Sequence, residues 1–167
     1  FRPGPLSAGV DNDYVESKEH PQRISYLCDE AREVTEETFG FLIFQEQIAL
    51  LAHKLGGLTL DEGNMLRKVL TKKGTGKNSV KGKLHEKFIA GCVAKNIDRA
   101  DAQDLWDKFE YFSGYGFNKS HAVSYSIISY QCAWLFNYYP AEWMAAFLDK
   151  EPETRKEKAI NIAKKYG

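Results

Sequence analysis

Hydrophobic residues recur at intervals of three and four along much of this chain, which is the spacing of one face of an α-helix. Residues 45–55 show the pattern first, and Gly56 and Gly57 end it. The next repeat begins at Thr59, which forms with Glu62 the Thr-x-x-Glu pair typical of a helix N-terminus. The apolar positions of these two predicted helices are Ile48, Leu51, Ala52, Leu55, Leu60, Met65, Leu66, Val69 and Leu70.

Two further helices are predicted after a break in the pattern. The first runs from about Leu84 to Lys95, with Asn96 at its end. Asp98 can cap the second, because its side chain can accept a hydrogen bond from the first turn. The apolar face of that second helix carries Ala102, Leu105, Trp106 and Phe109.

The last third of the chain also has helical character. A long apolar helix is predicted from about Ser120 to Asn137, and Pro140 and Pro152 each begin another, the last one mostly charged. Aromatic residues are dense in this part, and their most common role is to fill a core. We therefore expect a core position for Trp134, Phe136, Tyr138, Tyr139 and Trp143.

Three segments lack the helical spacing. Residues 1–26 begin with FRPGP and are predicted to form a long extended loop that leads into the helices. Residues 40–44, GFLIF, fit a short buried strand or the approach to a helix. Residues 71–83, TKKGTGKNSVKGK, predict a mobile basic loop. With no internal repeat and no alternating strand pattern, the sequence predicts an all-α fold: an irregular multi-helix domain with a long N-terminal loop.

Composition narrows the picture only a little. The chain has 167 residues, 43% of them hydrophobic, which suffices for one core. Lysine and arginine total 23, as do aspartate and glutamate, so net charge does not indicate a polyanionic partner. Three widely spaced cysteines argue against a disulfide framework and suit a reducing cytoplasm. Neither a signal peptide nor an apolar run of about 20 residues is present. Because the chain begins with Phe1, we expect a fragment or a processed product.

The distribution of charge is more informative than its total. Residues 67–87 carry eight basic side chains and one acid, Glu86. Such a run is often only a solvated face, but lysines placed among glycines also allow a loop to follow nucleic-acid phosphates. The basic residues are Arg67, Lys68, Lys72, Lys73, Lys77, Lys81, Lys83 and Lys87.

A second candidate site is SGYGFNKSHAVSY, residues 113–125. A helix beginning near Ser120 would point unpaired N–H groups and partial positive charge back toward Gly114 and Gly116, where backbone can approach a ligand closely. Lys119 adds a full charge. This combination is typical of a phosphate site, but a capped helix after a required glycine turn explains the same residues. Further donors come from Asn118, Ser120 and His121.

Three better-known motifs are incomplete in this chain. In a phosphate-binding loop ending in GTGKNS, Thr71 would stand where glycine is needed and Asn78 where serine or threonine is needed. A zinc-binding HExxH motif would need histidine at Ile89. The dinucleotide pattern GxGxxG is broken by Lys119.

Three segments carry a resemblance to a known family: FRPGP, FGFLIFQEQIALLAHKLGGLTLDEGNMLRKVLTKK and FSGYGFNKSHAVSYSIISYQCAWLFNYYPAEWMAAFL. In order and in length they resemble the alpha subunit of bacterial replicative DNA polymerase III, of the C family. The resemblance implies the helical fingers region that follows the catalytic palm and meets the incoming nucleotide. It divides the chain into a segment after the palm, 1–39, the fingers domain, 40–150, and a charged C-terminal helix, 151–167.

The resemblance also implies site residues. In this chain Lys68 stands where the family usually has a second arginine, which weakens a bidentate phosphate contact. Gln45, Glu46 and Gln47 match a family block to which we assign a structural role. The implied nucleotide-binding residues are Arg67, Lys68, Lys72, Lys73, Gly116, Asn118, Lys119, Ser120 and His121. The implied DNA-binding residues are Lys77, Lys81, Lys83 and Arg2.

The resemblance places the chemistry itself elsewhere. Nucleotidyl transfer uses two divalent metals held by carboxylates, which in this family belong to the palm, upstream of RPGP. We therefore expect no catalytic residue and no metal ligand in this chain, Mg²⁺ on the palm, and no activity from the chain alone. The implied partners are template–primer DNA, deoxynucleoside triphosphate, the remaining alpha subunit and, through other regions, the sliding clamp, in the cytoplasm at the nucleoid. A non-enzymatic helical module that binds nucleic acid or serves as a scaffold is the alternative.

Overall fold

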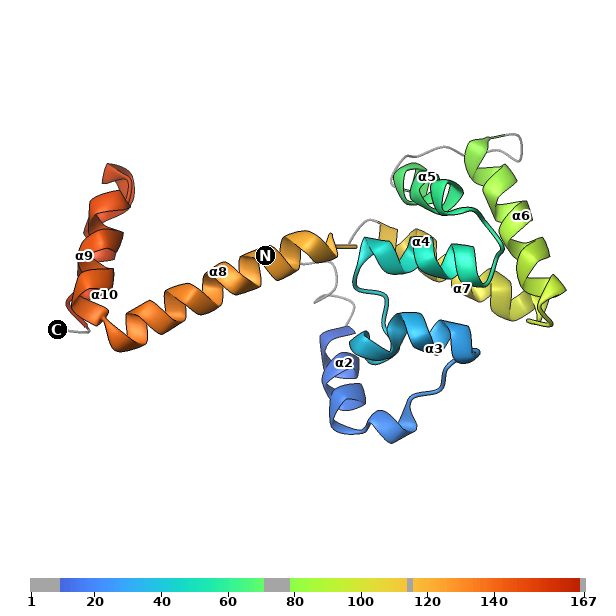
Figure 1. Ribbon diagram of the computed structural model, residues 1–167, viewed down its shortest axis with the longest axis horizontal. Coiled ribbons are helices and arrows are strands. Elements are labelled where there is room, and N and C mark those ends of the chain that lie inside the picture. Colours follow the sequence, from blue (N-terminus) through green and yellow to red (C-terminus); the bar gives the residue numbers. More distant parts are fainter. Residues whose placement is uncertain (1–9, 71–78, 114–115, 166–167) are drawn as a thin grey trace. The chain divides into compact units, whose positions relative to one another are not determined.

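The computed structural model of the chain describes residues 10–70, 79–113 and 116–165 (Figure 1). Over these residues the secondary structure is helical, with one isolated β-bridge and no strand, so the all-α prediction is confirmed. The fold divides into two compact units, Phe1–Lys119 and Ser120–Gly167. The α-helices are α2 (Val10–Glu19), α3 (Asp29–Thr35), α4 (Gln45–Lys54), α5 (Leu60–Leu70), α6 (Val80–Ala94), α7 (Arg99–Ser113), α8 (Lys119–Tyr138), α9 (Pro140–Lys150) and α10 (Glu153–Ala163).

The core of the first unit lies among α4, α5, α6 and α7 (Figure 1). Phe88 of α6 and Phe109 of α7 are fully buried, and Trp106 is 2% exposed. The Phe88 ring centroid lies 5.6 Å from that of Trp106 and 5.3 Å from that of Phe109, distances typical of favourable aromatic pairs. Most of the predicted apolar positions of these helices therefore meet in one core. The prediction is wrong for Leu60 and Met65 of α5, which are 54% and 47% exposed.

Two close backbone approaches hold α4, α5 and α6 together. A Cβ atom built on Gly91 of α6 would lie 2.0 Å from the carbonyl oxygen of Gly56, just after α4. A Cβ atom on Gly63 of α5 would lie 2.8 Å from the carbonyl oxygen of Ala49. Both contacts are shorter than any side chain allows, so glycine is required at these positions by the packing of neighbouring backbone.

The predicted helix ends are confirmed by their hydrogen bonds. The Thr59 N–H donates to the Glu62 carboxylate at 2.7 Å, and the Glu62 N–H donates to the Thr59 hydroxyl at 3.2 Å, which completes the capping box of α5. The Asp98 carboxylate accepts from the Ala100 N–H at 2.7 Å. Asn96 has φ of 62° and ends α6 in the left-handed conformation.

Two helices differ from the prediction: α2 lies in a segment that was expected to be a loop, and α6 begins earlier than expected. The segment expected as an extended loop contains α2. The centroid of its Tyr14 ring lies 5.4 Å from that of Phe39 and 5.9 Å from that of Phe41. Contacts between residues this far apart in the sequence cannot be inferred from local spacing. Helix α6 begins at Val80, because the Ser79 hydroxyl accepts from the Gly82 N–H at 3.1 Å and so caps it. Residues 80–83 of the predicted basic loop are therefore helical, while 1–9 and 71–78 lie outside the described residues.

Residues 40–44 form the approach to α4. Of the two alternatives for this segment, the strand is not found, since Phe44 makes only an isolated bridge before α4 begins. Gln47, on the first turn of α4, is buried and accepts hydrogen bonds from the N–H groups of Ile43 and Phe44, both at 2.9 Å. Its amide group donates to the Val34 carbonyl at 3.1 Å. The structural role assigned to Gln47 therefore has a clear physical basis.

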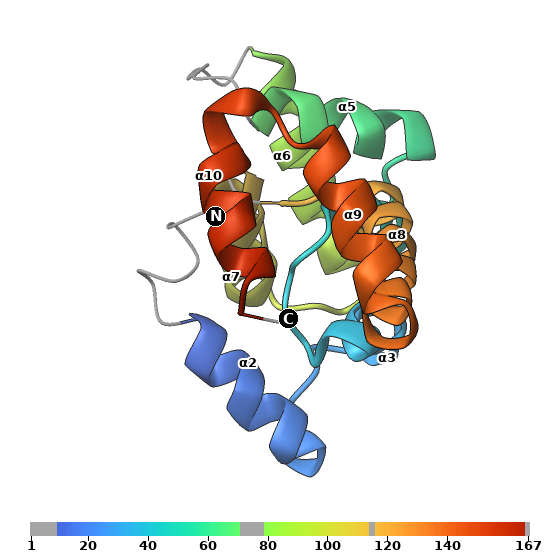
Figure 2. The same cartoon turned by 90° about the vertical axis from the view of Figure 1, so that its left-hand side faces the viewer.

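The second unit contains most of α8, together with α9 and α10, and the last two pack against each other (Figure 2). No described residue of α8 is buried. The side chains of Trp134, Tyr138 and Tyr139 are 45%, 63% and 50% exposed, and Phe136 and Trp143 are not buried, so the expected aromatic core is wrong. Trp134 instead makes ring contacts along its own helix, 5.0 Å from Tyr138. In the described segments, no helix is both long enough and apolar enough to cross a bilayer.

Candidate functional site

Two segments far apart in the sequence meet beside the start of α4. The Phe117 N–H donates to the Ile43 carbonyl at 3.0 Å, and the Gln45 N–H donates to the Phe117 carbonyl at 3.0 Å. Phe44 and Phe117 thereby form a parallel β-bridge. This backbone pairing, which we call the 44–117 bridge, brings the FNK residues directly before and at the start of α8 to the first turn of α4.

Glu46 connects the two segments through its carboxylate. One oxygen accepts from the Asn118 side-chain amide at 2.8 Å, and the other accepts from the Lys119 backbone N–H at 3.1 Å. Because Lys119 is the first residue of α8, the carboxylate lies at the positive end of the helix dipole, where an anion is stabilised. The predicted anion-binding position thus accommodates a negative charge, and in this structure a carboxylate of the chain itself provides it.

The Lys119 side chain has a second acidic neighbour. Its ammonium group contacts both carboxylate oxygens of Glu37, at 2.5 and 2.6 Å, and lies 5.6 Å from the centroid of the Phe44 ring. The two charged side chains remain 42% and 49% exposed. An exposed ion pair of this kind contributes about 0.2–1 kcal/mol, so it exchanges readily for a stronger anion.

Arg67 approaches the same corner from the end of α5. Its guanidinium group lies 3.5 Å from the Gln45 side-chain oxygen, the length of a weak hydrogen bond. Gly116 is buried, and a Cβ atom there would lie 2.9 Å from the Gln45 Cγ atom. The structure therefore gathers Arg67, Gly116, Asn118 and Lys119 around the first turn of α4, and we call this group the α4 corner.

The remaining predicted nucleotide-binding residues have different positions. Lys68 is exposed on α5. Ser120 and His121 lie on the first turn of α8 and belong to the second unit, where the His121 ring is 4.5 Å from that of Tyr125. Lys72 and Lys73 lie outside the described residues.

Two of the four predicted DNA-binding residues are described. Lys83 is exposed on α6, whereas the Lys81 ammonium lies 2.9 Å from the Glu110 carboxylate of α7. Burial raises the pKa of Glu110, but hydrogen bonds from Lys81 and Trp106 outweigh it, and the pKa of this carboxyl is lowered overall. Lys81 therefore has a structural partner in α7. Lys77 and Arg2 lie outside the described residues.

The acidic partners at the α4 corner were missed as site residues by sequence reasoning. Glu46 was recognised only within a structural block, and Glu37 carries no motif at all. Each contacts Lys119 across more than 70 positions, as the separations of 73 and 82 residues show. The only available signal was chemical. A lysine side chain and the start of a helix, with its partial positive charge, are both stabilised by an anionic partner.

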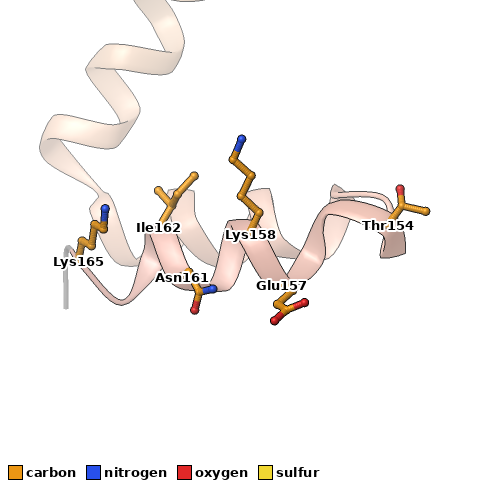
Figure 3. Close-up of a pocket in the computed structure, with 6 residues that line it drawn as sticks. All are labelled: Thr154, Glu157, Lys158, Asn161, Ile162 and Lys165. Atoms are coloured by element: carbon orange, nitrogen blue, oxygen red, sulfur yellow. The ribbon is translucent and has the colours of Figure 1, made fainter.

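Other features of the described residues are weaker candidates for a site. Over the described segments no three histidine, cysteine or acidic side chains lie close enough to hold a metal ion. A hollow of about 410 Å³ follows α10, but its lining residues come from that helix and from Lys165 just after it, and Figure 3 shows Glu157 and Lys158 projecting in different directions. Its side chains therefore do not converge on a ligand.

Comparison with known proteins decides the family. Residues 1–96 match the family model described as the bacterial DNA polymerase III alpha subunit finger domain. The chain belongs to this family. It is 37% identical over 162 residues to the DNA polymerase III subunit alpha of Campylobacter jejuni, an alignment that covers 97% of this chain. The corresponding protein of Escherichia coli K12 is 36% identical over 167 residues, again with 97% of this chain covered.

The finger-domain chain represents a small part of these relatives. It spans 13% of the Campylobacter protein and 14% of the Escherichia protein. The resemblance noted in the three sequence segments is confirmed. The match to the family model ends at residue 96, so it includes Phe44 of the 44–117 bridge but not Phe117.

Proposed function

We propose that the α4 corner binds the triphosphate of an incoming deoxynucleotide during DNA-templated synthesis. The observation that supports this most directly is the gathering of Arg67 and Lys119, from opposite parts of the sequence, at the start of α8. A guanidinium group can bind two phosphate oxygens at once, and an ammonium group adds a compact positive charge. The start of α8 lies beside Lys119, but its first N–H already donates to Glu46, so the two cations carry the proposed contact.

The contribution of these cations to catalysis would be electrostatic. Negative charge on the triphosphate is redistributed as pyrophosphate leaves, and fixed cations stabilise that change. Two-metal chemistry needs carboxylates that the described residues do not gather. We assign Mg²⁺ and the catalytic acids to another part of the polymerase, and we expect no catalysis by this chain alone.

The remaining expectations follow from the same role. Exposed Lys83 would face the template–primer phosphates, together with Lys77, Lys81 and Arg2. The rest of the alpha subunit and, through other regions, the sliding clamp would be its protein partners. Such a protein would act in the cytoplasm at the nucleoid, where its template lies.

Nucleotide binding by point variants tests this function. Calorimetry with a deoxynucleoside triphosphate at low ionic strength should show that Lys119→Ala and Arg67→Ala each weaken binding by about tenfold, since hydrogen bonds to charged groups contribute roughly 1.5–3 kcal/mol. Lys108→Ala is the matched control, because it also removes one positive charge but lies on α7, paired with Asp104. An equal loss in all three variants would show that only net charge matters.

Two further results would contradict the proposal. Robust primer extension by the chain with magnesium would show that catalytic acids lie within it. Binding of single-stranded DNA that depends on the lysines of 72–83 but is unaffected by Lys119→Ala, without any nucleotide binding, would instead support the non-enzymatic nucleic-acid module.

A further inference from the structure

We propose that the two acidic partners of Lys119 have opposite roles: Glu37 competes with phosphate for the ammonium group, whereas Glu46 is a positioning residue that stays in place. This inference rests on the proposed triphosphate site. It adds a built-in competitor to that site, so that Lys119 exchanges one anion for another when nucleotide binds.

The position of Glu37 suits a displaceable partner. It lies in the short 3₁₀ helix η2 (Glu36–Thr38), and its carboxylate contacts only the ammonium end of Lys119 among the hydrogen bonds of the site. Both side chains are close to half exposed, so each can rotate into solvent without opening the core. A phosphate group carries more negative charge than a carboxylate and more acceptor oxygens, and it therefore displaces Glu37 from Lys119.

Glu46 differs from Glu37 in what it holds. Its carboxylate accepts from a backbone N–H, that of Lys119, and from the Asn118 amide. It is partly buried, and it precedes Gln47, which is anchored by four hydrogen bonds. Removing the Glu46 carboxylate would leave the first N–H of α8 without this acceptor and would loosen the 44–117 bridge.

The geometry also indicates how phosphate approaches. Because Glu46 covers the first N–H of α8, the accessible cation is the Lys119 side chain on the side that Glu37 occupies. Arg67 is a second cation of the α4 corner, with its guanidinium group 3.5 Å from the Gln45 side-chain oxygen. A triphosphate would therefore replace Glu37 first and would bind alongside Glu46 rather than in its place.

Titration of the 167-residue chain with inorganic triphosphate at low ionic strength tests the opposite roles. We expect Glu37→Gln to tighten binding about twofold to fivefold, the range that corresponds to loss of an exposed ion pair. We expect Glu46→Gln, whose single amide oxygen replaces two carboxylate acceptors, to weaken binding and to raise the exchange rate of the Lys119 amide proton. Glu33→Gln is the matched control: it removes the same charge from the neighbouring helix α3, where Glu33 pairs with Lys54.

Each outcome has one meaning. Equal tightening by Glu37→Gln and Glu33→Gln would overturn the competitor role, because net charge alone would explain it. Tightening by Glu46→Gln would overturn its positioning role. Absence of triphosphate binding in the unsubstituted chain, or binding unaffected by Lys119→Ala, would overturn the proposed function and this inference together. Far-ultraviolet circular dichroism of each variant separates these effects from unfolding.

Discussion

Replacement of Gln47 by leucine should destabilise the first unit strongly, although the two side chains are similar in size. Gln47 is 2% exposed, and its amide group satisfies partners in two separate segments. It accepts from the N–H groups of Ile43 and Phe44, and it donates to the Val34 carbonyl and the Thr38 hydroxyl. A leucine would fill the space but would make none of these four hydrogen bonds.

The size of the effect follows from the groups left without partners. Thr38 keeps its hydrogen bonds to the carbonyls of Thr35 and Phe41, so its hydroxyl stays satisfied. Val34 is buried, whereas the N–H groups of residues 43 and 44 are only partly buried and can reach water. Only the Val34 carbonyl is then buried without this partner, so at roughly 1–3 kcal/mol for each unsatisfied buried group the free energy of unfolding should fall by about 1–3 kcal/mol.

Urea unfolding measured by tryptophan fluorescence is a direct assay. Trp134→Phe and Trp143→Phe in the background would leave Trp106, which lies in the core of the first unit, as the reporter. Gln22→Leu is the control, since Gln22 is exposed in the 3₁₀ helix η1 (Pro21–Arg23). A Gln47→Leu value within about 0.5 kcal/mol of the control, the usual range for surface substitutions, would refute the reasoning.

Three shorter predictions concern other parts of the first unit. Gly91→Ala should lower the free energy of unfolding in urea by about 1–3 kcal/mol or more, because the added carbon would overlap the carbonyl of Gly56. A hydrogen bond from Lys87 lowers the pKa of Glu62 in the folded chain. The ionised Glu62 therefore stabilises the fold above the ordinary carboxyl pKa, and this contribution is lost as pH falls through the pKa of the folded state. Glu62→Gln should flatten this part of the curve of Tm against pH. Burial raises the pKa of Cys92 to about 11, so iodoacetamide at pH 8 should modify it only after unfolding; peptide mass spectrometry distinguishes it from the partly exposed Cys28 and Cys132, and rapid modification of Cys92 itself in the folded chain would contradict its burial.

Helix ends were predictable where the chemistry is local. Thr59 and Glu62 are three positions apart and complete their capping box without help from the rest of the chain. Asp98 behaves in the same way. The start of α6 was missed because Ser79 stands among glycines and lysines, and that composition concealed a serine cap. Helix α2 depends on contacts of Tyr14 with distant rings, which no local pattern encodes.

Sequence reasoning selected cations that the structure brings to the α4 corner, but it did not select their acidic partners. Family motifs directed attention to Arg67 and Lys119, and the structure places both at the α4 corner. Glu37 and Glu46 become neighbours of Lys119 only through the 44–117 bridge, which is made by backbone atoms. Backbone pairing between segments this far apart depends on the whole fold, so single-sequence reasoning could not have predicted it.

The contact between Gly56 and Gly91 has a consequence for how this domain can evolve. A side chain at Gly91 would overlap the Gly56 carbonyl, and one at Gly56 would overlap the Phe88 ring of α6, so either would press α6 away from the end of α4. Such a shift would carry Lys83 with it, since that residue lies on α6. Substitution of either glycine would thus change the position of the basic Lys83 side chain. Selection that acts on the position of Lys83 would therefore also preserve the two glycines.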